Sequence, residues 1–146
     1  MEGGAIEVEL ADTSVWARKS KPGLEWFAPA IEDGRIAVCD MLALEVLFSA
    51  RDLADFRVIE DGLLACPWLA TEPRDWAEAR RVFGELAARG PLHHRQVRIP
   101  DLLIAAVAAR HAVTVVHYDG DYDGDYDVIA DVTGQPTRWA APRGSL

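Results

Sequence analysis

Short β-branched runs alternate with longer helical stretches along this chain, and that alternation constrains the fold more than any other feature. β-Branched and apolar residues predict strands over residues 6–11, 35–39, 67–69 and 113–118, and an edge strand over 137–139. Periodicity and capping residues predict helices over 15–18, 24–33, 41–50, 52–64, 75–88 and 102–111, with one further turn at 128–130. Residues 91–98 show no period and are predicted to be a loop. Strands joined through helices imply right-handed crossovers, so we predict an α/β fold with helices on both faces of a central, mainly parallel sheet.

Length and composition are typical of a soluble globular protein. The 146 residues suffice for a single domain, predicted over 1–146; half of them are hydrophobic and 27% are charged. No apolar run approaches the roughly 20 residues that span a bilayer, and the first residues lack the basic and apolar regions of a signal peptide. We therefore expect a cytoplasmic protein without a membrane segment. The cysteines, Cys39 and Cys66, lack the spacing of a zinc site and are predicted to be buried free thiols.

Acidic residues recur at the carboxyl ends of the predicted strands. Asp12, Asp40 and Asp119 each follow a strand directly. Asp101 lies at the start of a buried helix, and Glu45 lies in an apolar helical stretch without a basic neighbour in the sequence. Functional groups of open α/β sheets gather at this edge, and a buried carboxylate is costly unless it is paired or metal-bound. Taken singly, Asp12 and Asp101 are also explained as helix N-caps, and Glu45 as a side chain at the solvent edge of its helix.

A cluster of carboxylates without matching bases is what a hard cation such as Mg²⁺ or Mn²⁺ requires. Two such ions about 4 Å apart hold a phosphodiester, activate a water molecule and stabilise the leaving oxygen. The acids therefore favour metal-dependent hydrolysis of phosphodiester bonds, and they predict that activity is lost when the metal is removed.

The charge of the chain is distributed unevenly. A net charge of −9 is unusual for a protein that binds phosphates, because Lys and Arg normally supply that binding. Residues 71–100 are the one net-basic stretch, with six arginines against four acids. We predict that His93, Arg95 and Arg98, which precede Asp101, contact substrate phosphates. An exposed polar loop is the alternative interpretation of these three residues.

Four of the acids occur, in order, within distinctive segments of the chain. The segments are Leu10-Ala11-Asp12-Thr13-Ser14, Leu44-Glu45-Val46, Ile99-Pro100-Asp101-Leu102-Leu103-Ile104-Ala105-Ala106, and Val116-His117-Tyr118-Asp119 followed by Ile129-Ala130. Together they resemble the PIN-domain nucleases, and more closely the VapC toxins of bacterial toxin–antitoxin modules. The resemblance implies a three-layer α/β/α fold, Mg²⁺ or Mn²⁺, and endoribonuclease activity on structured RNA such as tRNA or rRNA. It also implies a homodimer that a small VapB-like antitoxin protein inhibits.

The same resemblance assigns roles to individual side chains. The catalytic, metal-holding quartet is Asp12, Glu45, Asp101 and Asp119. The first and third look like direct metal ligands, while the second and fourth would act directly or through water. Thr13 or Ser14 resembles the hydroxyl beside the first acid that orients the site, and Asp121 would be an auxiliary acid at the metal.

A tandem Gly-Asp-Tyr-Asp duplication over residues 120–127 departs from the family pattern. Family members usually read Tyr-Asp-x-Asp-Tyr-Asp followed directly by Val-Ile-Ala, and here four extra residues intervene. We favour Asp119 as the fourth acid because it ends the predicted strand. Asp123 takes that place if the insertion lies upstream in register.

Three rival interpretations bear on the same acids. Residues 119–124 fit the first half of a calcium loop, but Ala130 stands where the last ligand belongs and a strand precedes the segment. A phosphatase with an Asp-x-Asp nucleophile would need a downstream lysine, and the chain has none after Lys21. The remaining alternative is a PIN-like fold that serves as a catalytically weak protein-binding module, which a missing acid would favour.

Overall fold

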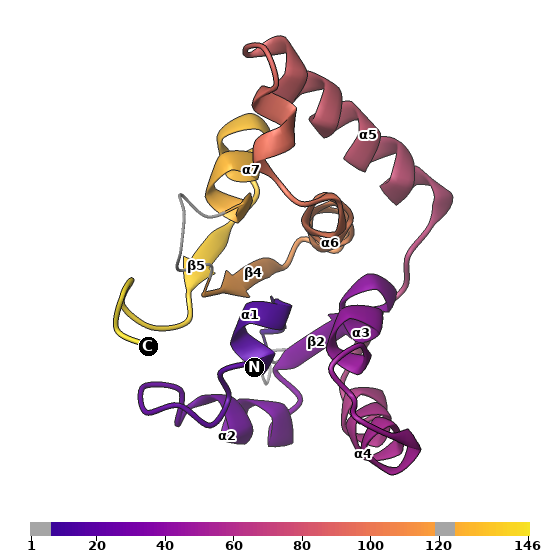
Figure 1. Ribbon diagram of the computed structural model, residues 1–146, viewed down its shortest axis with the longest axis vertical. Coiled ribbons are helices and arrows are strands. Elements are labelled where there is room, and N and C mark those ends of the chain that lie inside the picture. Colours follow the sequence, from indigo (N-terminus) through magenta and orange to yellow (C-terminus); the bar gives the residue numbers. More distant parts are fainter. Residues whose placement is uncertain (1–6, 119–124) are drawn as a thin grey trace, which may run out of the picture.

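A parallel β-sheet forms the centre of the computed structural model, which describes residues 7–118 and 125–146 (Figure 1). Its strands are β1 (Glu9–Ala11), β2 (Ile36–Cys39), β3 (Trp68–Leu69), β4 (Thr114–His117) and β5 (Thr137–Trp139). They lie in the order β3-β2-β1-β4-β5, and each pairing is parallel. The predicted α/β fold with a parallel sheet is confirmed, and each predicted strand is present, with β5 at the edge.

Helices connect and cover the strands. They are α1 (Thr13–Trp16), α2 (Phe27–Glu32), α3 (Asp40–Leu47), α4 (Leu53–Leu64), α5 (Pro73–Ala88), η1 (His93–Gln96, a 3₁₀ helix), α6 (Ile99–Arg110) and α7 (Asp125–Thr133). The prediction of a plain loop at 91–98 was wrong, since it contains η1. The turn predicted at 128–130 is the middle of the longer α7, because Asp125 and Asp127 occupy its first turn, where acids stabilise a helix. Within the described ranges, no helix combines the length and apolarity needed to cross a bilayer.

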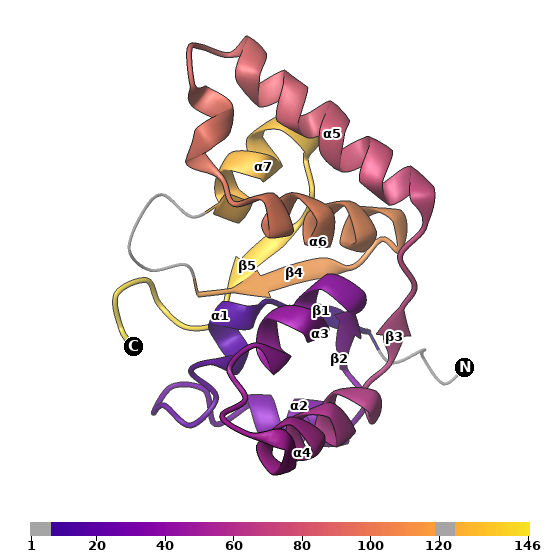
Figure 2. The same cartoon turned by 45° about the vertical axis from the view of Figure 1, so that its right-hand side comes forward.

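Two hydrophobic cores lie on opposite faces of the sheet, because successive strand residues point to opposite sides. Leu10 and Val115 belong to the larger core, with side chains from α3 to α7. The adjacent Ala11 and Val116 belong to the smaller core, with side chains from α1, α2 and the C-terminal segment. In Figures 1 and 2, α5, α6 and α7 group at one end of the molecule, and α2 and α4 lie at the other. Cys39 and Cys66 are buried and free, as predicted.

The junction of α5 and α6 is closed by a buried ion pair. Arg110 donates from Nε to Asp75 Oδ1 at 2.8 Å and from Nη2 to Asp75 Oδ2 at 3.0 Å. The same guanidinium donates to the carbonyl oxygen of Ala70 and lies 3.3 Å from Glu72 Oε1. Asp75 also accepts from the backbone N–H of Glu72 at 2.8 Å, within a capping box at the start of α5. These contacts fix the C-terminus of α6 against the N-terminus of α5.

Candidate metal centre

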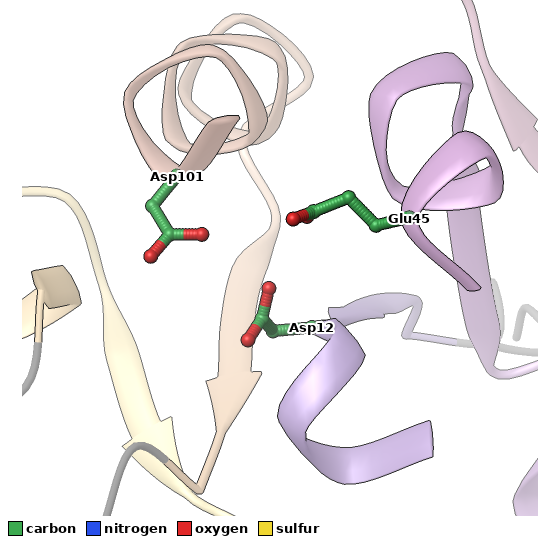
Figure 3. A group of neighbouring side chains, drawn as sticks. All are labelled: Asp12, Glu45 and Asp101. Atoms are coloured by element: carbon green, nitrogen blue, oxygen red, sulfur yellow. The ribbon is translucent and has the colours of Figure 1, made fainter. Parts of the chain in front are cut away.

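Three carboxylates from separate elements converge at the carboxyl edge of the sheet. Asp12 follows β1, Glu45 lies on α3 and Asp101 lies in the first turn of α6. Figure 3 shows the three side chains pointing toward one another, and one oxygen of each lies within 4.8 Å of the others. Asp12 is 5% exposed and Asp101 is 3% exposed, so water solvates neither carboxylate fully. The structure thus brings together the three members of the predicted quartet that lie in its described ranges.

Asp12 is fixed by the turn that joins β1 to α1. Its backbone N–H donates to the carbonyl oxygen of Val116 at 2.8 Å, which ties the end of β1 to β4. Its Oδ2 accepts from Ser14 Oγ at 2.9 Å and from the Ser14 N–H at 3.2 Å, so Asp12 is indeed the N-cap of α1. Ser14 Oγ in turn accepts from the Tyr118 N–H at 2.9 Å. Ser14 therefore links Asp12 to the end of β4.

Glu45 has two partners at the mouth of the cluster. Its Oε1 accepts from Thr13 Oγ1 at 3.2 Å, and its Oε2 accepts from Arg98 Nη2 at 2.5 Å. The Glu45 side chain is 14% exposed, whereas that of Arg98 is 62% exposed. Glu45 has no basic neighbour in the sequence, and the fold brings Arg98 to it from 53 residues away. Thr13 and Ser14 thus bind different acids, Glu45 and Asp12 respectively.

Asp101 lies among other carboxylates in the interior. Burial, a hydrogen bond with Asp125 and the negative charges of Asp12 and Asp125 raise the pKa of Asp101 to about 10, against a smaller opposing effect of Arg98. In the metal-free protein Asp101 therefore holds a proton at neutral pH. This is the behaviour of a carboxylate placed where a cation belongs, since a bound cation would replace that proton.

Tyr126, which was not among the predicted site residues, contacts two of the acids. Its hydroxyl lies 2.6 Å from Asp12 Oδ1 and 3.2 Å from Asp101 Oδ1, and the residue is fully buried. Burial first, and then the nearby carboxylates, raise the pKa of Tyr126 well above its usual range, so the hydroxyl remains a neutral donor. The helical spacing of Tyr126 and Ile129, both buried on α7, is the signal that points it inward.

Asp125 also contacts the cluster and was not among the predicted site residues. It is the first residue of α7, hydrogen-bonds with Asp101, and accepts from the Arg98 N–H through Oδ2 at 2.8 Å. The predicted positions Asp119, Asp121 and Asp123 lie outside the described residues.

The remaining predicted residues differ in their surroundings. Arg98 reaches Glu45, while His93 lines a cavity of about 500 Å³ together with Arg89, Gln96, Asp127 and Arg143. Arg95 is exposed on η1. Asp40, which follows β2, accepts from Trp68 Nε1 at 3.1 Å.

The donor set fits a hard divalent cation. Carboxylate oxygens are the ligands that Mg²⁺ and Mn²⁺ prefer, and three of them converge here from rigid elements. Asp12, Glu45 and Asp101 are the residues that would hold the ion. The guanidinium of Arg98 is the positive group that contacts the cluster in the described ranges, and it reaches only Glu45 by a hydrogen bond.

The amino-acid sequence matches the family model of the PIN domain over residues 10–124. The chain belongs to the PIN domain family. The matched segment begins at β1 and contains Asp12, Glu45 and Asp101, so the three converging carboxylates lie within the family's domain.

Relatives from Mycobacterium tuberculosis match this PIN domain protein over nearly its whole length. Ribonuclease VapC18 is 39% identical over 141 residues, which are 95% of this chain and 99% of the relative. Ribonuclease VapC51 is 37% identical over 138 residues, which are 94% and 96% of the two chains. The predicted likeness to the VapC group is confirmed.

Solved structures with the same fold have diverged far in sequence. A chain of the DNA-bound VapBC from Salmonella typhimurium has a TM-score of 0.65 at 18% identity, covering 92% of this chain and 99% of its own length. A chain of FitAB bound to an IR36 DNA fragment has a TM-score of 0.66 at 16% identity, covering 91% and 95%. The predicted three-layer α/β/α architecture is thereby confirmed.

Proposed function

We propose that this protein is a Mg²⁺- or Mn²⁺-dependent endoribonuclease that acts in the cytoplasm as the toxin of a toxin–antitoxin pair. The observation that carries the proposal is the convergence of Asp12, Glu45 and Asp101 at the carboxyl edge of the sheet. The full-length relatives named as VapC ribonucleases support RNA as the substrate. Structured RNA, tRNA or rRNA, is the class that we propose.

The side chains of the site have distinct tasks in this mechanism. A bound Mg²⁺ or Mn²⁺ supplies positive charge against the phosphodiester oxygens and lowers the pKa of a water molecule. Asp12, after β1, and Asp101, in the first turn of α6, would hold the ion together with Glu45 on α3. Thr13 and Ser14 keep the Glu45 and Asp12 carboxylates in place through the hydrogen bonds at 3.2 Å and 2.9 Å.

Asp125 is our proposal for an acid that completes the centre. Its hydrogen bond with Asp101 and its place at the start of α7 support this role. Asp119, the fourth acid predicted from the sequence, and Asp123 stay as alternatives, with Asp121 as the auxiliary acid. Single substitutions to Asn at the four positions test the assignment: the acid of the centre is the one whose loss abolishes cleavage while the protein stays folded.

Arg98 is the residue that we propose to contact an RNA phosphate at the mouth of the site. Its side chain is largely exposed, yet its guanidinium already reaches the acids through Glu45. A guanidinium carries several N–H donors, so it contacts Glu45 and a phosphate oxygen at once. Arg98→Met should raise KM more than it lowers kcat, whereas Arg57→Met, on the exposed surface of α4, should change neither. His93 and Arg95 stay as predicted secondary contacts.

A groove beside the centre is our proposed site for the antitoxin. It has a volume of about 500 Å³, lies between α1, α3 and α4, and includes Thr13 and Glu45 in its wall. Its apolar wall is formed by Trp16, Val46, Val58, Ile59 and Leu63. The VapBC complexes among the structural neighbours support a VapB-like partner. An apolar segment of that partner with a basic side chain directed at Glu45 would fill the groove and block the acids. Val58→Asp should abolish binding without changing cleavage.

The homodimer is proposed from the family resemblance. Exposed apolar side chains on α3 are available for such contact, since Phe48, at its C-terminal end, is 91% exposed and Leu44 is 63% exposed. Sedimentation of the wild type and of Phe48→Ser distinguishes a dimer that uses this surface from a monomer.

Cleavage of a mixed tRNA and rRNA preparation tests the proposed activity. Purified, antitoxin-free protein with Mg²⁺ or Mn²⁺ should produce discrete fragments, which EDTA and Asp12→Asn should each abolish. Asp61→Asn, an exposed acid on α4, is the matched control and should cleave normally. Intact RNA with every metal, from folded protein, would contradict the proposal and support the PIN-like binding module instead.

A further inference from the structure

The Tyr126 hydroxyl lies between the two most deeply buried acids of the centre. It donates to Asp12 Oδ1 at 2.6 Å and approaches Asp101 Oδ1 at 3.2 Å. These two carboxylates come from elements far apart in the sequence, and Tyr126 belongs to a third element, α7. One side chain therefore bridges the start of α1 and the start of α6.

The hydrogen bonds around Asp12 show why this bridge matters. Oδ2 of Asp12 is already held by Ser14, so the Tyr126 hydroxyl is the partner that fixes the orientation of Oδ1. A carboxylate oxygen has two lone pairs, and the bond from Tyr126 occupies one and leaves the other for a cation. The Tyr126 ring is held by the neighbouring His117 ring at 5.4 Å and is fully buried, so its hydroxyl has little freedom to move.

We propose that Tyr126 is a positioning residue of the metal centre, whose hydroxyl holds Asp12 and Asp101 in the arrangement in which they share a cation. The inference deepens the proposed function and rests on it, since it requires that the acids bind a metal. Outer-shell hydrogen-bond partners of this kind change metal affinity by about 10- to 100-fold when they are removed. Packing alone would leave metal affinity unchanged.

Calorimetric titration with Mn²⁺ tests the proposal directly. Tyr126→Phe removes the hydroxyl and keeps the ring, so Mn²⁺ affinity should fall by about tenfold. Tyr118→Phe is the matched control, because Tyr118 is also buried and its hydroxyl accepts from the Leu146 N–H at 2.8 Å, away from the acids. That control should bind Mn²⁺ like the wild type. Unchanged affinity in folded Tyr126→Phe would overturn the proposal.

A second measurement covers the case in which Tyr126→Phe does not fold. The chain has three tyrosines, so Tyr118→Phe combined with Tyr122→Phe leaves Tyr126 alone. Labelled with fluorotyrosine, this protein should show one fluorine resonance that shifts when Mg²⁺ is added. A resonance that does not respond to saturating Mg²⁺ would overturn the proposal. A wild type that binds neither ion would instead refute the proposed metal dependence, and this inference with it.

Discussion

Two buried aspartates, Asp75 and Asp101, occupy the same kind of position with opposite surroundings. Each lies in the first turn of a helix, α5 or α6, and they are 2% and 3% exposed. Asp75 meets the guanidinium of Arg110 through two hydrogen bonds at 2.8 and 3.0 Å. Asp101 meets other acids instead. The same side chain therefore forms a structural ion pair in one place and, in the other, lies among acids that favour its protonated form.

The pKa values of the two groups express this difference. Burial raises the pKa of Asp75, but hydrogen bonds from Arg110 and from the Glu72 N–H outweigh it, so the pKa is lowered overall. At Asp101, burial and the neighbouring acids act in the same direction and raise the pKa. A buried acid with its own base needs nothing further, whereas a buried acid among acids needs a proton or a cation. The comparison thus distinguishes a structural acid from a metal-binding one.

The largest difference between the two aspartates is expected in the RNA cleavage rates of their Asn variants. Asp101→Asn removes a proposed metal ligand, so RNA cleavage should fall by at least about a hundredfold, beyond the usual effect of losing an outer-shell partner. Asp75→Asn should cleave RNA at the wild-type rate well below its melting temperature. Rates at saturating Mn²⁺, measured on protein whose folding is verified by circular dichroism, provide the comparison. Equal losses in the two variants would refute the distinction.

For thermal stability we expect the reverse: Asp75→Asn should be affected more than Asp101→Asn. Asp75→Asn removes the buried carboxylate that pairs with Arg110 and leaves its guanidinium beside the more exposed Glu72, so the melting temperature should fall by roughly 5 to 10 °C. Asp101→Asn removes a carboxylate from a cluster of acids, so the melting temperature of the metal-free protein should stay the same or rise. Thermal unfolding in EDTA measures both, with Asp61→Asn as the surface control. A large loss of stability in metal-free Asp101→Asn would contradict this account.

The pH dependence of stability sharpens the same comparison. The folded metal-free protein binds one more proton at Asp101 than the unfolded chain between the usual carboxyl pKa of 3.8 and about 10. The contribution of Asp101 to the free energy of unfolding therefore declines as pH rises through this range. The lowered pKa of Asp75 has the opposite effect: its stabilisation is present at neutral pH and is lost in acid. Urea unfolding at pH 6 and pH 9 in EDTA should show a smaller alkaline decline in Asp101→Asn than in the wild type; equal declines would contradict the assignment.

Removing the hydroxyls of Ser14 and Thr13 should have the smallest effects on RNA cleavage. Ser14→Ala removes the bond to Asp12 Oδ2 and leaves the Tyr118 N–H without its acceptor, so kcat should fall by roughly tenfold. Thr13→Val removes a longer bond, at 3.2 Å, to the more exposed Glu45 and should have less effect. Steady-state cleavage rates rank the two. A larger loss of kcat in Thr13→Val than in Ser14→Ala would contradict this ranking and would indicate that the position of Glu45 matters more than that of Asp12.

Much of this fold and site was predictable from local patterns. Strand runs such as 113–118 stand out because buried parallel strands are continuously apolar and β-branched. Asp12 and Asp101 were found because each follows a strand or begins a buried helix, and both positions lead to the carboxyl edge of a parallel sheet. Glu45 was found because a lone acid in an apolar helix is costly without a partner.

The partners of these acids were not predictable, because they depend on contacts between distant segments. The ion pair of Arg98 with Glu45 spans 53 residues, and that of Arg110 with Asp75 spans 35. Asp125 and Tyr126 were missed for another reason: the duplication repeats Asp and Tyr several times, so the pattern alone did not single out the pair at the start of α7. The helical spacing of Tyr126 and Ile129 is the local signal that could have identified Tyr126.

Mn²⁺ titration of the wild type and of Asp101→Asn tests the central claim most directly. Calorimetry at neutral pH in two buffers of different ionisation enthalpy reports both affinity and the number of protons released. The wild type should bind Mn²⁺ and release about one proton per ion, because the cation displaces the proton of Asp101. Asp101→Asn should bind at least about a hundredfold more weakly and without that release. Equal affinity in the two proteins, or no binding to the wild type, would contradict the account.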